Sequence, residues 1–263
     1  MSAAQFIQSR DNPQLRMVRK LASDNTAYRK AGRFWIEGEH LCSAALLRGA
    51  KPAMAFFSES GWARAESGWA RAPRPEVAAA VYVLPEALFG SLSALESPAD
   101  MGFVMEVPAP AAIDPHAATL VLDRVQDAGN VGSMLRSASA FGFGQVIALR
   151  GTAALWSPKV LRAGMGAHFA LSLLEGADLD SVQALAVPLL VTSSHAGALI
   201  QDCRLPFPCA WAMGHEGQGV QPALMARAAQ QVRIGQPGGE ESLNVAAAAA
   251  ICLHASALAG AAR

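Results

Sequence analysis

Segments of strand length alternate with helix-like segments through the second half of this chain, and this alternation constrains the fold more than any other feature. The expected strands are apolar and occupy residues 119–122, 146–149, 189–192, 210–213 and 231–234. The expected helices occupy residues 130–141, 181–186 and 222–228, and a last helix begins at Leu243. Apolar strands separated by helices form a largely parallel sheet with helices on both faces. The sequence therefore predicts an α/β domain over residues 118–263.

Three glycine-marked segments stand at the ends of expected strands. They begin at Asp123, Met213 and Ile234. Open α/β sheets bind ligands beyond the carboxyl ends of their strands, and glycine lets the backbone turn tightly and approach a ligand closely. The sequence therefore predicts a ligand site where the three segments meet.

The residues within these segments form three motifs in a fixed order. The first is NVGSMLRSASAFG at 130–142, the second is GHEGQG at 214–219, and the third is SLNV at 242–245. They match the patterns N-x-G-x-x-x-R-x-A-x-x-F-G, G-x-E-x-x-G and S-L-N-V. Over residues 118–260 the chain therefore resembles the SpoU (TrmH-like) RNA 2'-O-ribose methyltransferases of the SPOUT superfamily.

This resemblance implies a parallel-sheet domain whose C-terminal segment threads a trefoil knot, acting as a homodimer. It implies S-adenosylmethionine as the cofactor, a ribose 2'-hydroxyl of RNA as the methyl acceptor, and a pocket that receives Arg136 from the partner chain. The residues that it assigns to the cofactor are Thr192, Gly214, Ile234 and Leu243. The residues that it assigns to the reacting groups are Asn130, Arg136, Glu216, Ser242 and Asn244.

Arg136 is the base that the resemblance favours, but the chemistry of arginine leaves a second role open. A guanidinium has a pKa above about 12, whereas a general base must be unprotonated when it acts. Arg136 could instead orient the hydroxyl and stabilise negative charge that develops on its oxygen. The sequence leaves both roles open.

Each of these polar residues also has a purely structural alternative. Asn130, Ser242 and Asn244 could cap helices, and Glu216 could cap the turn that follows it. Arg136 could be an ordinary arginine on a helix surface. These alternatives explain each residue singly, but they do not explain the joint pattern.

The first part of the chain has a different organisation. Three prolines within residues 108–115 favour an extended linker. The expected division is an RNA substrate-binding domain at 1–107, a linker at 108–117 and the methyltransferase domain at 118–263. The segments SRDNPQLRMVRKL and FWIEGEHL resemble a smaller α/β domain like ribosomal protein L30e. Between its expected elements the segment ESGWARA occurs twice, at 59–65 and 66–72, and we expect an expanded surface loop there.

Basic side chains concentrate at the start of the chain. Residues 1–33 carry seven of them against two acidic ones, although the whole chain has a formal net charge of zero. Such an excess suits contact with a phosphate backbone, and the alternative is a solvated helix face. The candidate RNA-binding residues are Arg10, Arg16, Arg19, Lys20, Arg29, Lys30 and Arg33.

Several other classes of protein are disfavoured. The four cysteines form no CxxC pair, so we expect reduced thiols and no metal site. The N-terminal segment is polar and basic, and the chain holds no apolar stretch long enough to span a bilayer, so we expect a cytoplasmic protein without a membrane partner.

The sequence thus predicts transfer of a methyl group to structured RNA. Ribosomal RNA is favoured over transfer RNA, because an L30e-like domain suits RNA with loops and bulges. The alternatives are a transfer-RNA 2'-O-methyltransferase, a non-catalytic RNA-binding or assembly factor with the same fold, and a base methyltransferase on the same scaffold. Intact Asn130 and Arg136 disfavour the last two.

Overall fold

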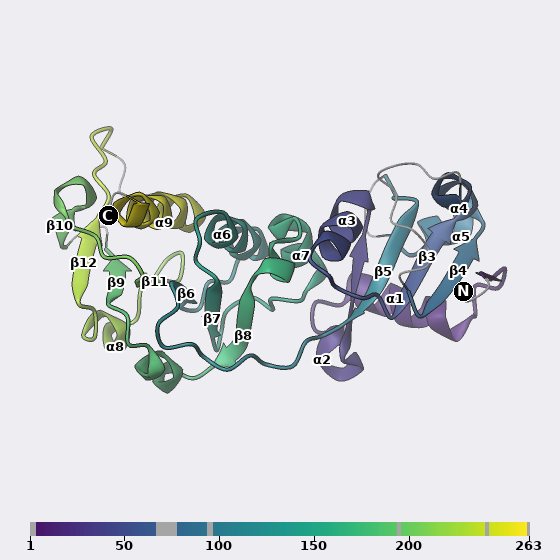
Figure 1. Ribbon diagram of the computed structural model, residues 1–263, viewed down its shortest axis with the longest axis horizontal. Coiled ribbons are helices and arrows are strands. Elements are labelled where there is room, and N and C mark those ends of the chain that lie inside the picture. Colours follow the sequence, from purple (N-terminus) through teal and green to yellow (C-terminus); the bar gives the residue numbers. More distant parts are fainter. Residues whose placement is uncertain (1–3, 67–77, 94–96, 194–195, 240–241, 262–263) are drawn as a thin grey trace. The chain divides into compact units, whose positions relative to one another are not determined.

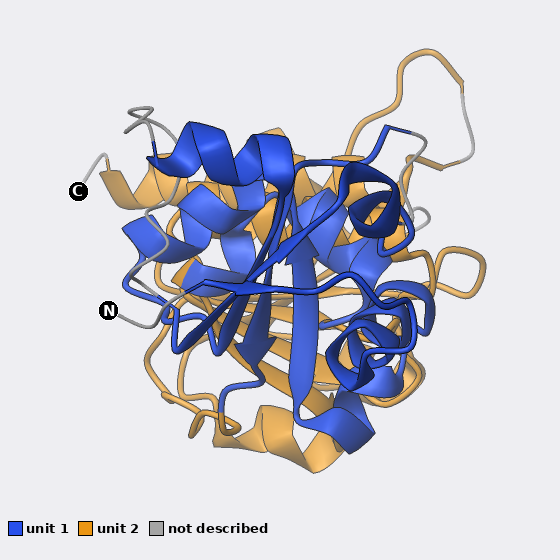
Figure 2. Cartoon of the chain, turned by 90° about the vertical axis from the view of Figure 1, so that its right-hand side faces the viewer, with its two compact units in different colours: residues 1–108, 156–169 blue, residues 109–155, 170–263 orange. Residues whose placement is uncertain are grey.

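The computed structural model describes residues 4–66, 78–93, 97–193, 196–239 and 242–261. The chain forms two compact units, which Figure 2 shows in blue and orange. Unit 1 comprises residues 1–108 and 156–169, and unit 2 comprises residues 109–155 and 170–263. Residues 156–169 therefore belong to the first unit, although the sequence assigned them to the second domain.

Unit 1 is built on a five-stranded sheet with the order β1-β4-β3-β5-β2. Strand β5 runs antiparallel to β2 and β3, and the other pairs are parallel. The strands are β1 (Gln5–Phe6), β2 (Arg33–Glu37), β3 (Met54–Ser58), β4 (Ala80–Leu84) and β5 (Met101–Glu106). The helices are α1 (Pro13–Ser23), α2 (Ala27–Ala31), α3 (Glu39–Leu47), α4 (Glu59–Glu66), α5 (Glu86–Gly90) and α7 (Pro158–Gly164), and a short 3₁₀ segment, η2 (Ala167–Ala170), follows α7.

Helix α1 carries much of the basic sequence. Its apolar residues Leu15, Val18 and Leu21 recur at helical spacing and are buried against the sheet, so its basic residues lie on the outer side. The side chain of Asn12 caps the helix by accepting a hydrogen bond from the Gln14 N–H at 2.8 Å.

The first copy of the ESGWARA repeat is not a loop. It forms helix α4, in which Gly61 and Ala65 are buried, and the Trp62 ring lies 5.7 Å from that of Phe57. The prediction of a surface loop is therefore wrong for this copy, because its small residues allow the helix to approach the sheet closely. Most of the second copy lies outside the described residues.

Unit 2 is built on a seven-stranded sheet with the order β10-β12-β9-β11-β6-β7-β8, in which every described pair is parallel. This confirms the predicted parallel α/β fold, and the trefoil knot stays a prediction. The strands are β6 (Thr119–Leu122), β7 (Gln145–Leu149), β8 (Ser172–Ala177), β9 (Leu189–Thr192), β10 (Ala198–Leu199), β11 (Ala210–Met213) and β12 (Gln230–Arg233). The helices are α6 (Ala128–Ala140), α8 (Pro222–Met225) and α9 (Val245–Ala261), with 3₁₀ segments η3 (Leu179–Ala184) and η4 (Ile200–Asp202).

The order of the strands in the unit 2 sheet determines where the candidate site lies. Strands β9, β11 and β6 are neighbours at the centre, and β12 lies beside β9. Since these strands are parallel, the segments that follow them emerge at one edge of the sheet. Helices α6 and α9, which follow β6 and β12, lie side by side above the sheet in Figure 1.

The sequence did not predict β8, β10 or α7. Strand β8 contains Glu175 and Gly176, which interrupt an apolar pattern. Helix α7 begins after Ser157, whose side chain accepts a hydrogen bond from the Val160 N–H. Among the described residues, no helix is long and apolar enough to cross a membrane.

Candidate active site

A cavity of about 450 Å³ opens at the carboxyl edge of the unit 2 sheet. All four residues that the sequence assigned to the cofactor line this cavity: Thr192, Gly214, Ile234 and Leu243. Glu216 and Ser242 line it as well. The cavity is therefore formed by the segments that follow β9, β11 and β12, together with the start of α9.

The second motif forms a tight hairpin that we call the 214–220 loop. His215 and Gly219 exchange two backbone hydrogen bonds of 3.1 and 2.8 Å. A Cβ on Gly214 would lie 2.1 Å from the carbonyl carbon of Gly219, and Gly219 itself has a φ of +68°. Glycine is thus required at Gly214 by close backbone approach and is favoured at Gly219 by the left-handed conformation.

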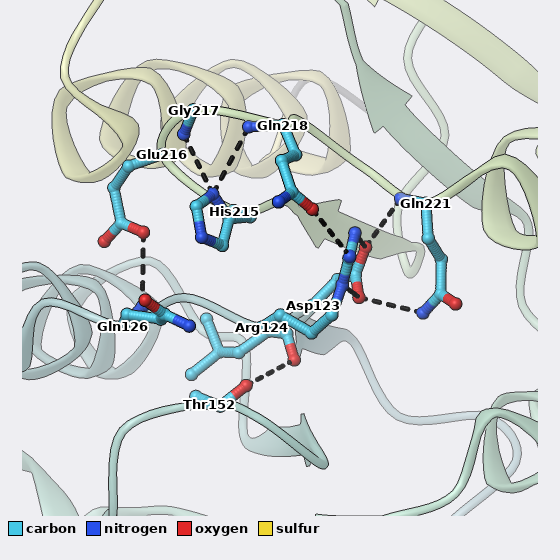
Figure 3. A network of polar contacts seen from close by, with 10 residues as sticks. Asp123, Arg124, Gln126, Thr152, His215, Glu216, Gly217, Gln218 and Gln221 are labelled. Carbon is cyan, nitrogen blue, oxygen red and sulfur yellow. Dashed lines mark hydrogen bonds and ion pairs between the residues drawn. The ribbon is translucent and has the colours of Figure 1, made fainter.

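His215 stabilises this loop from within. Its Nδ1 accepts hydrogen bonds from the backbone N–H groups of Gly217 at 3.0 Å and Gln218 at 3.3 Å (Figure 3). A nitrogen that accepts cannot carry the proton, so the neutral ring holds its hydrogen on Nε2. The side chain of His215 therefore stabilises the conformation of the 214–220 loop.

A buried carboxylate ties the loop to the end of β6. The side chain of Asp123 is fully buried, and it accepts hydrogen bonds from the backbone N–H of Gln221 at 2.7 Å and the Gln221 side-chain amide at 2.8 Å. The Arg124 guanidinium donates to Asp123 at 3.0 Å and to the side-chain oxygen (Oε1) of Gln218 at 3.1 Å (Figure 3). We call these four residues the loop clasp.

Sequence reasoning missed the loop clasp. Arg124 adopts a φ of +60°, a conformation that L residues adopt rarely. Its side chain lies against Gly151, where a Cβ would come within 3.2 Å of the Arg124 Cγ. The available signal was an acidic residue directly after a buried strand, but its partner is 98 residues further along the chain.

The carboxylate of Glu216 lies at the start of α6. It accepts hydrogen bonds from the backbone N–H groups of Gln126 at 3.2 Å and Asp127 at 3.0 Å, and from the Asn130 side-chain amide at 3.1 Å. Burial alone would raise the pKa of this carboxyl, but the hydrogen bonds outweigh it and hold the pKa below the ordinary value. The structure thus uses the charge of Glu216 to bind the start of α6.

Asn130 links Glu216 to the third motif. Its amide donates to Glu216, and its carbonyl oxygen accepts a hydrogen bond from the Asn244 amide at 2.9 Å. Asn130 is not the N-cap of α6, because Asp127 occupies that position and accepts from the Asn130 N–H at 2.7 Å. The capping alternative is therefore wrong for Asn130. It is correct for Asn244, whose carbonyl oxygen accepts from the N–H groups of Ala246 and Ala247 at the start of α9.

Arg136 lies apart from this group. Its side chain is exposed on α6, and it does not line the cavity. The structure thus brings Asn130, Glu216 and Asn244 into contact and places Ser242 on the cavity wall, but it leaves Arg136 outside.

The candidate RNA-binding residues all lie in unit 1. Some of them have structural partners: Arg19 donates to the Arg10 carbonyl oxygen at 2.9 Å, Arg29 donates to the Tyr28 hydroxyl at 3.2 Å, and Arg33 pairs with Glu106 at 3.8 Å. Arg16 and Lys20 are exposed one helical turn apart on α1. Among the described residues, no group of three or more His, Cys, Asp or Glu side chains is placed to hold a metal ion.

A parallel sheet with a cavity at its carboxyl edge, walled by glycine-rich segments, defines an α/β domain that binds a small-molecule ligand. Residues 117–254 match the model of the SpoU rRNA Methylase family, and the chain belongs to that family. It is 31% identical over 235 residues to 23S rRNA (guanosine(2553)-2'-O)-methyltransferase RlmP of Bacillus subtilis, an alignment that covers 86% of this chain and 88% of the relative.

Solved structures share the fold along nearly the whole chain. An RNA 2'-O ribose methyltransferase, 30% identical, superposes with a TM-score of 0.79 over 98% of this chain and 100% of its own. The SpoU methyltransferase AviRb from Streptomyces viridochromogenes, in complex with AdoMet, superposes with a TM-score of 0.81 over 96% of this chain and 100% of its own. At 23% identity, AviRb shows likeness of fold only.

Proposed function

We propose that this protein transfers a methyl group from S-adenosylmethionine to a ribose 2'-hydroxyl of ribosomal RNA. The observation that carries the proposal is the cavity, which residues of the second and third motifs line. Asn130 of the first motif is joined to this cavity wall by its hydrogen bonds to Glu216 and Asn244. The RlmP relative, whose name specifies 23S rRNA, supports the choice of ribosomal RNA.

The residues present fit this cofactor. A volume of about 450 Å³ lies within the range of roughly 300–1,000 Å³ that is usual for small-molecule sites. Apolar side chains of Val220, Ile234 and Leu243 offer a surface for a flat base, and Thr192 and Ser242 offer hydroxyl groups. The close approach at Gly214 keeps the loop thin, so that backbone rather than side chain forms part of the wall.

The cofactor, when bound, supplies an electrophilic methyl group on sulfur. The chain must then orient the ribose hydroxyl and stabilise the negative charge that develops on its oxygen. We assign this role to Arg136, because a guanidinium stays protonated in ordinary settings. Asn130, Glu216 and Asn244 act by fixing the two helix starts beside the cavity, since their polar atoms are bonded to one another or to backbone.

We further propose that the active form is a homodimer. Arg136 lies outside the cavity of its own chain, so a second chain must supply it if it acts there. Helix α9, which packs beside α6, exposes 40% of Ile251 and 57% of Leu258. These residues are seven positions apart and share one helix face, and large apolar side chains exposed in one stripe mark a surface for association.

Unit 1 is assigned to RNA binding. Its exposed basic residues Arg16 and Lys20 offer charges that suit a phosphate backbone, whereas Arg19 is held by the Arg10 carbonyl oxygen. The division of labour is then substrate affinity in unit 1 and chemistry in unit 2.

The test is methyl transfer from radiolabelled S-adenosylmethionine to purified ribosomal RNA and transfer RNA, with the modified nucleotide mapped as a 2'-O-methyl group. We expect labelling of ribosomal RNA at one nucleotide, and loss of labelling when that nucleotide is replaced by its 2'-deoxy form. Labelling of transfer RNA alone would overturn the substrate assignment. Cofactor binding without transfer to any RNA would favour an assembly factor.

A further inference from the structure

One buried polar group beside the cavity has no hydrogen-bond partner among the residues that the structure describes. The Gln236 side chain lines the cavity, and its carbonyl oxygen is buried without a hydrogen-bond partner among the described residues. A buried acceptor that loses water and gains no donor destabilises the protein, and native structures contain few of them. This position therefore suits a donor that arrives with a ligand.

The backbone holds Gln236 in place. Its main-chain carbonyl oxygen accepts a hydrogen bond from the Gly239 N–H at 3.1 Å, which closes a four-residue turn. Pro237 restricts the second position of this turn, and Gly239 has a φ of +83°. The amide is thus presented from a fixed turn rather than from a free chain end.

The apolar part of the cavity lining indicates which part of a ligand the cavity receives. Ile234, Leu243, Val245 and Ala248 line the same cavity with apolar surface. Such surface suits the faces of an adenine ring, whereas a ribose or an amino-acid end needs several polar partners. Adenine carries one strong donor at its edge, the exocyclic 6-amino group.

We propose that Gln236 is a specificity-determining residue that accepts a hydrogen bond from the 6-amino group of the cofactor's adenine. This inference rests on the proposed function for the identity of the cofactor. Gln236 would then make the protein bind adenine more tightly than a base that carries an oxygen at position 6.

Calorimetric binding to the full-length protein tests this assignment without any catalytic turnover. The probes are S-adenosylhomocysteine and S-inosylhomocysteine, which carry an amine and an oxygen respectively at position 6. We expect the wild-type protein to prefer the adenosyl compound by on the order of 10-fold or more, the size of a typical net hydrogen bond plus the repulsion of two acceptors. Gln236→Leu should lower affinity for the adenosyl compound and bring the preference close to one.

Two further variants keep the result decisive. Gln236→Glu retains an acceptor and should keep the preference, even if Gln236→Leu were to fold poorly. Gln201→Leu changes a neighbouring exposed glutamine outside the cavity and should bind both compounds like the wild type.

An unchanged preference in a folded Gln236→Leu protein would overturn the inference. An equal loss of affinity for both compounds would also overturn it, because it would place Gln236 against the ribose or the amino-acid end. If the wild-type protein bound neither compound, the cofactor assignment itself would fail, which is a separate and recognisable outcome.

Discussion

The side-chain amide of Asn244 donates a hydrogen bond of 2.9 Å to the side-chain oxygen of Asn130, a residue 114 positions earlier in the chain. Because the amide of Asn130 donates in turn to Glu216, one chain of hydrogen bonds joins the three motifs. The starts of α6 and α9 are therefore fixed relative to the 214–220 loop.

The Asn130–Asn244 hydrogen bond should be detectable as a coupling energy. In a double-mutant cycle of Asn130→Ala and Asn244→Ala, we expect the changes in unfolding free energy to depart from additivity by about 0.5–1.5 kcal/mol. Chemical denaturation of the four proteins measures this quantity. Pairing Asn130→Ala with Gln183→Ala, whose only described partner is Asp180, should give additive changes. Additivity in both cycles would show that the bond is not formed in solution.

Asp123→Asn tests the loop clasp. Asparagine would turn an NH2 group toward one of the two Gln221 donors and would remove the charge that faces Arg124, so we expect the free energy of unfolding to fall by roughly 2 kcal/mol or more and cofactor affinity to fall with it. Asp178→Asn is the matched control, because Asp178 pairs with Arg150 at an exposed position, at 2.9 Å. Surface pairs of this kind contribute about 0–1 kcal/mol. Thermal unfolding and calorimetry of both variants make the comparison, and equal behaviour would contradict the clasp.

The lowered pKa of Glu216 predicts that the stability of the protein depends on pH. Its folded-state pKa is lowered below the ordinary value of 4.5, so its stabilising contribution is complete above about pH 4.5 and is lost as the pH falls through the folded-state pKa. Glu216→Gln should therefore unfold at a lower temperature than the wild type at neutral pH, and this difference should shrink in acid. A melting-temperature difference that stays constant from pH 7 to pH 3 would show that the charge is unimportant.

Arg136→Lys separates cofactor binding from the rate of methyl transfer. Lysine keeps the charge but lacks the planar fork of the guanidinium, so we expect nearly unchanged cofactor affinity and a rate of methyl transfer lower by about 10²-fold or more. Arg150→Ala removes another exposed arginine of unit 2 and should leave the rate unchanged. Single-turnover rates measured against pH identify the role. A steep recovery of Arg136→Lys toward pH 10 would favour a titrating base.

The basic surface of α1 should affect RNA affinity and not the chemical step. Replacing Arg16 and Lys20 together by glutamine should weaken RNA binding and reduce the slope of its salt dependence by about one unit per lost phosphate contact. Arg19 is left intact, because it supports the Arg10 carbonyl oxygen. Binding titrations at several salt concentrations provide the measurement. An unchanged slope would make this surface an ordinary solvated helix face.

Local patterns in the sequence predicted much of the fold. Strands β6, β7, β9 and β11 lie where apolar runs indicated them, because buried parallel strands leave a continuous apolar signal. Helix α7 was missed, since this short helix packs against β2 of unit 1 rather than against the strands that flank it in sequence. Asp123 and Gln236 were missed for a related reason: their roles depend on burial and on partners that only the folded chain brings near.

The chain passes between its two units three times, near residues 108, 155 and 169. Cutting the proline-rich segment alone would therefore release residues 1–108 as a separate peptide, whereas residues 156–169 of unit 1 would remain in one chain with unit 2. A shortened protein that begins at residue 118 would keep residues 156–169 but would lack strand β2, against which they pack. Trp156 and Leu161, which are buried in the whole chain, would then be exposed to water. Any hybrid enzyme that exchanges the N-terminal unit must exchange residues 156–169 with it.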